Sequence, residues 1–201
     1  MKTDKYTEEL PEVYVLAKHI SAKDAKTKII YALLSFVPVI VLFIAAFLTV
    51  YYTCGLSDAG DGIFRIISFV VTCLVYIAYI VLHELVHGAV YKICTGRKLK
   101  FGMSLTYAFC GVPDVYVYRK AAIPAIIMPF AVFTVVFTGL TVGAYFVNPL
   151  LFIEAAIILG LHLGGCVGDL HLTALFATRY TKPSTLMRDI GPEQFIYVKD
   201  E

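Results

Sequence analysis

The sequence predicts an all-α membrane protein: four transmembrane helices with a β-hairpin between the second and third helices. Of its 201 residues, 59% are hydrophobic and only 16% are charged, and the mean hydropathy is +0.79. Soluble domains are about half apolar and about a quarter charged. Four apolar runs are long enough to cross a bilayer, and one stretch between them alternates with a period of two. The apolar content excludes a disordered chain, and a net charge of +2 leaves no basic surface for nucleic acid.

The four predicted helices cover residues 29–52, 63–93, 121–147 and 150–177. The ~30 Å hydrocarbon core of a bilayer takes about 20 residues of helix, so each run can span it. Lysine and arginine concentrate in 1–28, in 92–120 and in the tail, whereas the loops at 57–61 and 148–149 carry none. Because basic residues accumulate on the cytoplasmic side, we expect both termini there. The expected organisation is an N-terminal cytoplasmic segment (1–28), a polytopic membrane domain (29–180) and a cytoplasmic tail (181–201).

Residues 98–109 alternate between apolar and small or polar side chains, which is typical of a β-strand. A turn signal at 110–114 leads into a second β-prone run at 115–118. Two interpretations of this 98–118 hairpin are open. It either connects two helices in the cytoplasm, or dips into the membrane and takes part in holding substrate.

The motif His83-Glu84-Leu85-Val86-His87 lies near the end of the second predicted helix. Histidines at i and i+4 lie on one helical face, where two imidazoles can bind one Zn²⁺ while the intervening glutamate acts as a base. An ionisable side chain inside a span costs on the order of 3 kcal/mol, so three within five residues indicate pairing, solvation or metal binding. The five cysteines form no CxxC pair, so a cysteine zinc site is not expected.

A catalytic zinc ion takes three protein ligands and keeps one position for water, so a third ligand is required. Asp169, in the fourth predicted helix, stands ten residues before Arg179, and His83 stands nine residues before Lys92. At 1.5 Å per residue these positions are about 15 and about 14 Å from the cytoplasmic end. Asp169 and His83 are therefore predicted to lie at one level.

His162 shares the helical face of Asp169 and lies about 10 Å deeper. It is predicted to give polar support behind the ligands, and it remains an alternative third ligand. Gly160, Gly164 and Gly168 form a strip of small residues on the same helix. Such strips let helices approach closely, so we expect this one to bring Asp169 within reach of helix 63–93.

The HELVHG segment at 83–88, the proline-containing third run (Pro124, Pro129) and Gly168-Asp169-Leu170 resemble the small bacterial putative zincin peptidase family, which is similar to site-2 intramembrane zinc metalloproteases. The resemblance covers about residues 29–180. It implies that His83, His87 and Asp169 bind one Zn²⁺ per chain and that Glu84 is the catalytic acid and base. It also implies a multi-pass protein of the bacterial plasma membrane.

We therefore expect an intramembrane zinc metalloprotease that hydrolyses peptide bonds by zinc-activated water. Its expected partners are a membrane-embedded or membrane-adjacent protein or peptide substrate and the lipid bilayer, without nucleic acid. Two other functions stay open. One is a non-catalytic metal-binding membrane scaffold, sensor or immunity-type protein; the other is a transporter that uses the buried ionisable residues as a cation or proton path.

Overall fold

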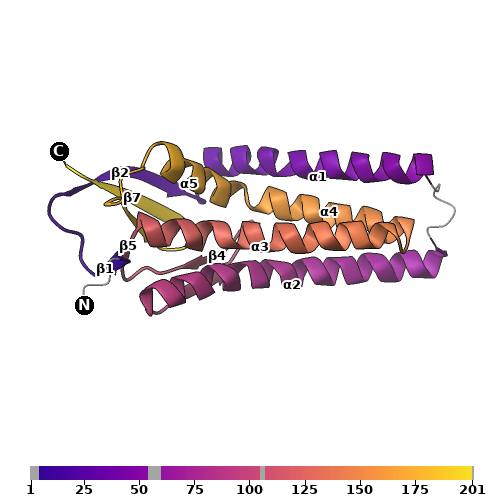
Figure 1. Cartoon of the computed structure of the whole chain (residues 1–201), viewed down its shortest axis with the longest axis horizontal. Helices are drawn as coiled ribbons and strands as arrows, with labels where there is room; N and C mark the ends of the chain where they lie inside the picture. Colours follow the sequence, from indigo (N-terminus) through magenta and orange to yellow (C-terminus); the bar gives the residue numbers. More distant parts are fainter. Residues whose placement is uncertain (1–4, 54–59, 105–106, 201) are drawn as a thin grey trace. The chain divides into compact units, whose positions relative to one another are not determined.

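The computed structural model describes residues 5–53, 60–104 and 107–200. Within these ranges the chain is mostly helical, with five α-helices and seven β-strands (Figure 1). Residues 57–59 of the first predicted loop, and Leu105 and Thr106 of the predicted alternation, lie outside the described residues.

Three helices are long and apolar enough to cross a membrane: α1 (Ala25–Thr53), α2 (Gly62–Thr95) and α3 (Arg119–Tyr145). Most of their large apolar side chains are exposed, as expected where the outer surface of a helix contacts lipid. The fourth predicted helix instead forms two helices, α4 (Pro149–Gly165) and α5 (Val167–Thr178), bent by 45°. If this bent pair is one broken span, the described chain has up to four spans.

The break between α4 and α5 falls at Cys166, whose backbone N–H bonds to the carbonyl oxygens of His162 and Gly164. Apolar composition alone predicted a continuous helix here. However, Gly164, Gly165 and Gly168 crowd around Cys166, and each glycine in a helix interior costs about 1 kcal/mol relative to alanine. The low helix propensity of this short stretch is the physical reason that one predicted helix becomes two.

The chain divides into two compact units. The first comprises Met1–Ile29, Val81–Pro129 and Asp169–Glu201, and the second comprises Ile30–Ile80 and Phe130–Gly168. The second unit is a bundle of helical segments. Ala46 and Val50 of α1 pack against Ile153 and Ala156 of α4, and Tyr79 of α2 packs with α3 and α4 side chains.

The predicted partner of the small-residue strip was wrong, because the strip packs against α1. A Cβ atom at Gly160 would lie 2.7 Å from the Cα atom of Val39, and one at Gly164 would lie 2.3 Å from the carbonyl oxygen of Ser35. The Ser35 hydroxyl donates to the Gly164 carbonyl at 2.7 Å. The glycines therefore allow α1 and α4 to approach at backbone distance within the second unit.

The first unit contains an antiparallel sheet of five strands in the order β1-β5-β6-β7-β2. Its strands are β1 (Tyr6–Thr7), β2 (Tyr14–Ser21), β5 (Tyr116–Tyr118), β6 (Leu186–Asp189) and β7 (Glu193–Lys199). Strand β2 pairs with β7 along nearly its whole length. The N-terminal segment and the tail, for which the sequence predicted no strands, thus meet in one sheet. Its inner side chains, among them Val117, Met187 and Ile196, join a buried core with Phe176 of α5.

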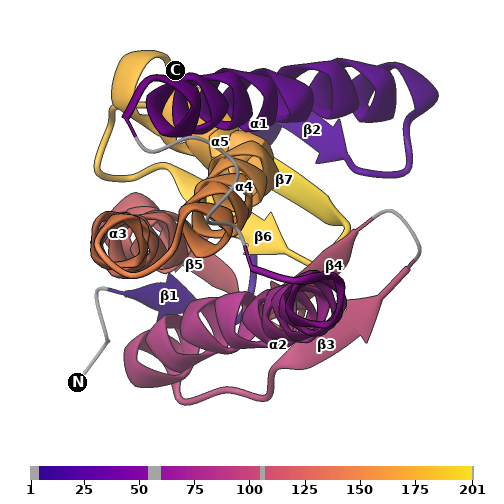
Figure 2. The same cartoon turned by 90° about the vertical axis from the view of Figure 1, so that its right-hand side faces the viewer.

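Two further strands, β3 (Lys100–Met103) and β4 (Ala108–Gly111), pair antiparallel with each other. The predicted pairing of 98–109 with 115–118 does not form, since β5 pairs with β1 and β6 instead. The chain reverses inside the alternating stretch, where the Ser104 N–H donates to the Tyr107 carbonyl at 2.7 Å. Figure 2 shows β3 and β4 beside α2. Gly88 of α2 leaves room there, because a Cβ atom at this position would meet the Phe101 ring at 2.8 Å.

Candidate metal centre

Two histidines of α2 lie next to each other on one face of the helix. The rings of His83 and His87 have centroids 4.9 Å apart at 73°, and both residues are buried. Their i, i+4 spacing on a regular helix produces this proximity directly. Two imidazoles are thus held side by side on a helix that is apolar enough to span a membrane.

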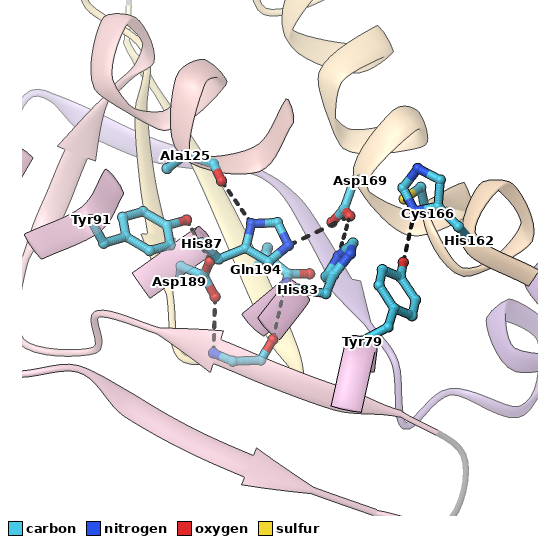
Figure 3. A network of polar contacts seen from close by, with 11 residues as sticks. Tyr79, His83, His87, Tyr91, Ala125, His162, Cys166, Asp169, Asp189 and Gln194 are labelled. Carbon is cyan, nitrogen blue, oxygen red and sulfur yellow. Dashed lines mark hydrogen bonds and ion pairs between the residues drawn. The ribbon is translucent and has the colours of Figure 1, made fainter. Parts of the chain in front are cut away.

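Asp169 supplies a carboxylate to this pair from the first turn of α5. Its Oδ2 atom lies 3.3 Å from Nε2 of His83 and 3.5 Å from Nε2 of His87 (Figure 3). The positive end of the α5 dipole favours a negative charge at this position. Because α5 begins anew after the break at Cys166, Asp169 stands near a helix N-terminus rather than in the middle of a span.

The two nitrogen–oxygen separations agree with the ligand spacing around a tetrahedral metal ion. Zinc bonds to imidazole nitrogen and carboxylate oxygen are about 2.0–2.1 Å long, and at tetrahedral angles this puts neighbouring ligand atoms about 3.3 Å apart. The two nitrogen–oxygen distances, 3.3 and 3.5 Å, match this spacing. Two imidazoles and a carboxylate are also a donor set that zinc takes in catalytic sites.

The tautomer of His87 gives a second test of this fit. Its Nδ1 atom lies 2.7 Å from the carbonyl oxygen of Ala125, and because a carbonyl only accepts, Nδ1 must carry a proton. In the neutral ring Nε2 then has a lone pair, which faces the Asp169 carboxylate. Two acceptors at 3.5 Å are favourable only with a cation or a proton between them. The residues present therefore fit a divalent metal ion.

Glu84 lies beside the histidines and takes part in neither of their ion pairs with Asp169. It is half-buried, and a carboxylate oxygen of Glu84 lies within 4.8 Å of ring nitrogens of both His83 and His87. At this distance the carboxylate can either bind a metal ion held by the histidines or exchange protons beside it.

His162 belongs to the second unit and has its own partners there. Its Nδ1 atom lies 2.8 Å from the Tyr79 hydroxyl, and its Nε2 atom lies 3.0 Å from the Thr134 hydroxyl. The Cys166 sulfur lies 3.7 Å from Nδ1. Both ring nitrogens thus meet hydroxyl groups of the same unit, and the role of His162 behind the metal ligands stays a prediction.

A buried network that the sequence did not predict lies on the same face of α2. Tyr91, one turn beyond His87, donates its hydroxyl to Oδ2 of Asp189 at 2.6 Å, and the Gly191 N–H donates to Oδ1 at 2.9 Å. Burial raises the pKa of Asp189 to about 6. The i+4 spacing from His87 places Tyr91 on the same helical face and could have been predicted. Nothing in the sequence of the C-terminal tail identifies Asp189 as the partner of Tyr91.

The family of the chain follows from comparison with known proteins. The family described as "Putative zincin peptidase" matches residues 76–184, more than half of the chain. The matched range includes His83, Glu84, His87 and Asp169. Comparison with curated proteins finds no match, and neither does comparison with solved structures. The chain belongs to the putative zincin peptidase family.

Proposed function

We propose that this chain is an intramembrane zinc metalloprotease, with one zinc ion held by His83, His87 and Asp169 and with Glu84 as its acid and base. The main support is the approach of two imidazole Nε2 atoms to a single carboxylate oxygen. These groups lie in a chain that belongs to a zincin family and has three to four helices apolar enough to span a membrane.

The proposed division of labour follows the chemistry of each group. Zinc, when bound, polarises a peptide carbonyl and lowers the pKa of water. Glu84 accepts the proton of the attacking water and passes it to the leaving amine. Asp169 completes the ligand set, and the backbone carbonyl of Ala125 orients the ring of His87 through its Nδ1 atom. Burial of both histidines limits the competition of bulk water for these contacts.

In the membrane setting that we propose, α4 and α5 together are the fourth span and both termini are cytoplasmic, in a bacterial plasma membrane. The distribution of basic residues supports this orientation. The sheet supports a common side for the two termini: β2 pairs with β7, and an open sheet edge does not occur in the hydrocarbon region. This pairing supports a placement of both terminal segments on the same side of the bilayer.

Strand β3 is the proposed docking edge for substrate. A peptide bond inside a transmembrane helix is shielded, so the substrate must be extended before hydrolysis, and main-chain pairing to a strand edge does this. In the described part of the chain β3 pairs only with β4. Along an antiparallel ladder, hydrogen-bonded residue pairs alternate with pairs that are not hydrogen-bonded. Ser104 and Tyr107 form a hydrogen-bonded pair, so the next pair, Met103 and Ala108, is not hydrogen-bonded. The N–H of Met103 therefore points away from β4.

The outward direction of the Met103 N–H suggests a substitution that tests this docking edge. Met103→Pro removes an outward N–H without breaking the β3–β4 ladder, so the protein should fold and bind zinc as wild type does while cleavage slows. Met103→Ala is the matched control, since it removes the exposed side chain and keeps the N–H. Equal cleavage by the proline and alanine variants would exclude this edge as the docking site.

The proposed function is tested by combining metal analysis with a peptidase assay. Purified wild-type protein should contain zinc and cleave a transmembrane peptide reconstituted with it. Glu84→Gln should retain the zinc and lose at least about 100-fold in rate, since general acid–base catalysis contributes about 10²–10⁴-fold. A Glu84→Gln variant that cleaves as fast as wild type would contradict the proposal, as would wild-type protein that binds no zinc.

A further inference from the structure

The carbonyl of Ala125 in α3 lacks the usual i+4 donor of its own helix. In an α-helix the carbonyl of residue i accepts from the N–H of residue i+4, and here residue 129 is proline, inside the helix. Proline has no backbone N–H. Ala125 is fully buried and Pro129 is less than 2% exposed, so water does not replace the missing donor. A buried carbonyl in this situation needs another partner.

That partner is the metal-binding face of α2. Nδ1 of His87 donates to the Ala125 oxygen at 2.7 Å, and this bond directs Nε2 of the same ring toward Asp169. We infer that Pro129 is a positioning residue of the metal centre. By withholding an N–H it reserves the Ala125 carbonyl for His87, which fixes both the tautomer and the orientation of the ligand ring. The inference rests on the proposed function, and it concerns a residue that touches neither metal nor substrate.

The energetic reason is competition for one oxygen. Replacement of Pro129 by any other residue restores an N–H that lies along the helix axis, on the line of the ordinary i to i+4 bond. The Ala125 carbonyl would then turn toward its own helix, and its bond to His87 would weaken. The Nε2-protonated tautomer of His87, which cannot bind a metal through Nε2, would become accessible.

Helix α3 contains its own control. Pro124 also lies inside this helix, and the carbonyl whose helical donor it removes is that of Lys120, an exposed residue in the first turn. Pro124→Ala therefore makes the same chemical change in the same helix, without altering the donor supply of Ala125. If proline acts only by bending α3, both variants should change zinc binding. If Pro129 positions His87, only Pro129→Ala should change it.

The test measures zinc binding rather than activity. Wild type, Pro124→Ala and Pro129→Ala are purified in detergent, stripped of metal and titrated with zinc against a chelator of known affinity. Loss of a group that orients a metal-bound histidine typically costs about 10–100-fold in affinity. We expect that loss for Pro129→Ala and a change below about threefold for Pro124→Ala. Equal zinc affinity of Pro129→Ala and wild type would overturn the inference.

A second measurement needs only wild-type protein, in case Pro129→Ala does not fold. In metal-free protein with ¹⁵N-labelled histidine, the ring of His87 should show a protonated Nδ1 coupled to the Ala125 carbonyl; a protonated Nε2 alone would overturn the inference. The failure of the proposed function is distinguishable. It would appear as wild-type protein without zinc or as an active Glu84→Gln variant, whereas failure of the positioning role leaves both of those results intact.

Discussion

Two buried histidine clusters of this protein differ in what their ring nitrogens face. In the second unit, both nitrogens of His162 meet hydroxyl groups, at 2.8 and 3.0 Å. A hydroxyl can donate or accept, so a neutral imidazole is satisfied there without an ion. In the first unit, Nε2 of His83 and Nε2 of His87 both face one carboxylate oxygen. For His87, whose proton is on Nδ1, this contact brings two acceptors together.

The difference shows which kind of buried histidine indicates a metal site. Burial of the histidines and an apolar helical setting are common to both clusters, so neither property distinguishes them. The two clusters differ in their count of donors and acceptors. The His162 cluster is complete as hydrogen bonds, whereas the His83–His87–Asp169 cluster needs a cation or a further proton between its acceptors. Substitutions in the two clusters and in the elements around them test this contrast.

The strongest contrast is expected in zinc affinity. Asp169→Ala removes the oxygen shared by the two imidazoles, so its zinc affinity should fall by more than the roughly 10–100-fold typical of outer-shell changes. His162→Gln keeps a polar side chain among hydroxyls and should bind zinc within a fewfold of wild type. The measurement is a competition titration with a chelator. The reverse pattern, with zinc lost only in His162→Gln, would make His162 the third ligand.

Asp189 is a third kind of buried group. The hydrogen bonds that its carboxyl accepts from Tyr91 and Gly191 lower its pKa by less than burial raises it. Its pKa is raised from 3.8 to about 6, so between these values the folded protein holds a proton that the unfolded chain has lost. The free energy of unfolding should therefore fall as pH rises from about 4 through 6, by at most about 3 kcal/mol.

The Asp189→Asn variant removes this titration and keeps groups that can bond to Tyr91 and Gly191. Thermal unfolding of wild type and variant in detergent, compared from pH 4.5 to 8, should show the difference between their stabilities growing in favour of the variant and levelling above pH 6. Parallel curves across this range would show that Asp189 titrates alike in the folded and unfolded protein.

The second unit should depend on packing rather than on metal. Gly164→Ala puts a Cβ atom 2.3 Å from the Ser35 carbonyl oxygen, whereas a Cβ atom at Gly165 meets nothing within 4 Å. Overpacking of this kind costs about 1–3 kcal/mol, so Gly164→Ala should unfold at lower temperature with unchanged zinc content. Gly165→Ala is the matched control and should be neutral or stabilising. Equal melting temperatures for the two variants would contradict the close approach of α1 and α4.

The smallest effect is expected at the His162 cluster itself. Tyr79→Phe removes the hydroxyl that meets Nδ1 and should cost about 1 kcal/mol of stability, the usual net value of a hydrogen bond. Zinc affinity should not change. A fall in zinc affinity with unchanged stability would show that the His162 cluster takes part in metal binding. It would contradict the distinction between this cluster and the His83–His87–Asp169 cluster.

Some of this arrangement could be predicted from the sequence because it depends on local geometry. The spacing of His83 and His87 on one helix places their rings together, and residue counts to the basic ends put Asp169 at the level of His83. The alternation after α2 also predicted strand structure. Each of these inferences uses only the rise and period of a single element.

Other features depend on segments far apart in the sequence. The pairing of β2 with β7 joins residues near the two ends of the chain, and their short runs carry no mark of a partner. The same holds for Tyr91 and Asp189. The break at Cys166 arises from three nearby glycines, a local cause, but apolar composition concealed it. The role of Pro129 could be inferred only once Ala125 was found opposite His87.

In the proposed metal centre, two imidazole nitrogens and one carboxylate oxygen hold the same zinc ion. X-ray absorption at the zinc edge of the purified protein tests this arrangement most directly. The expected spectrum has nitrogen and oxygen neighbours at about 2.0–2.1 Å, with the multiple-scattering pattern of two imidazoles. A sulfur neighbour at about 2.3 Å, or a zinc ion without imidazole scattering, would contradict it.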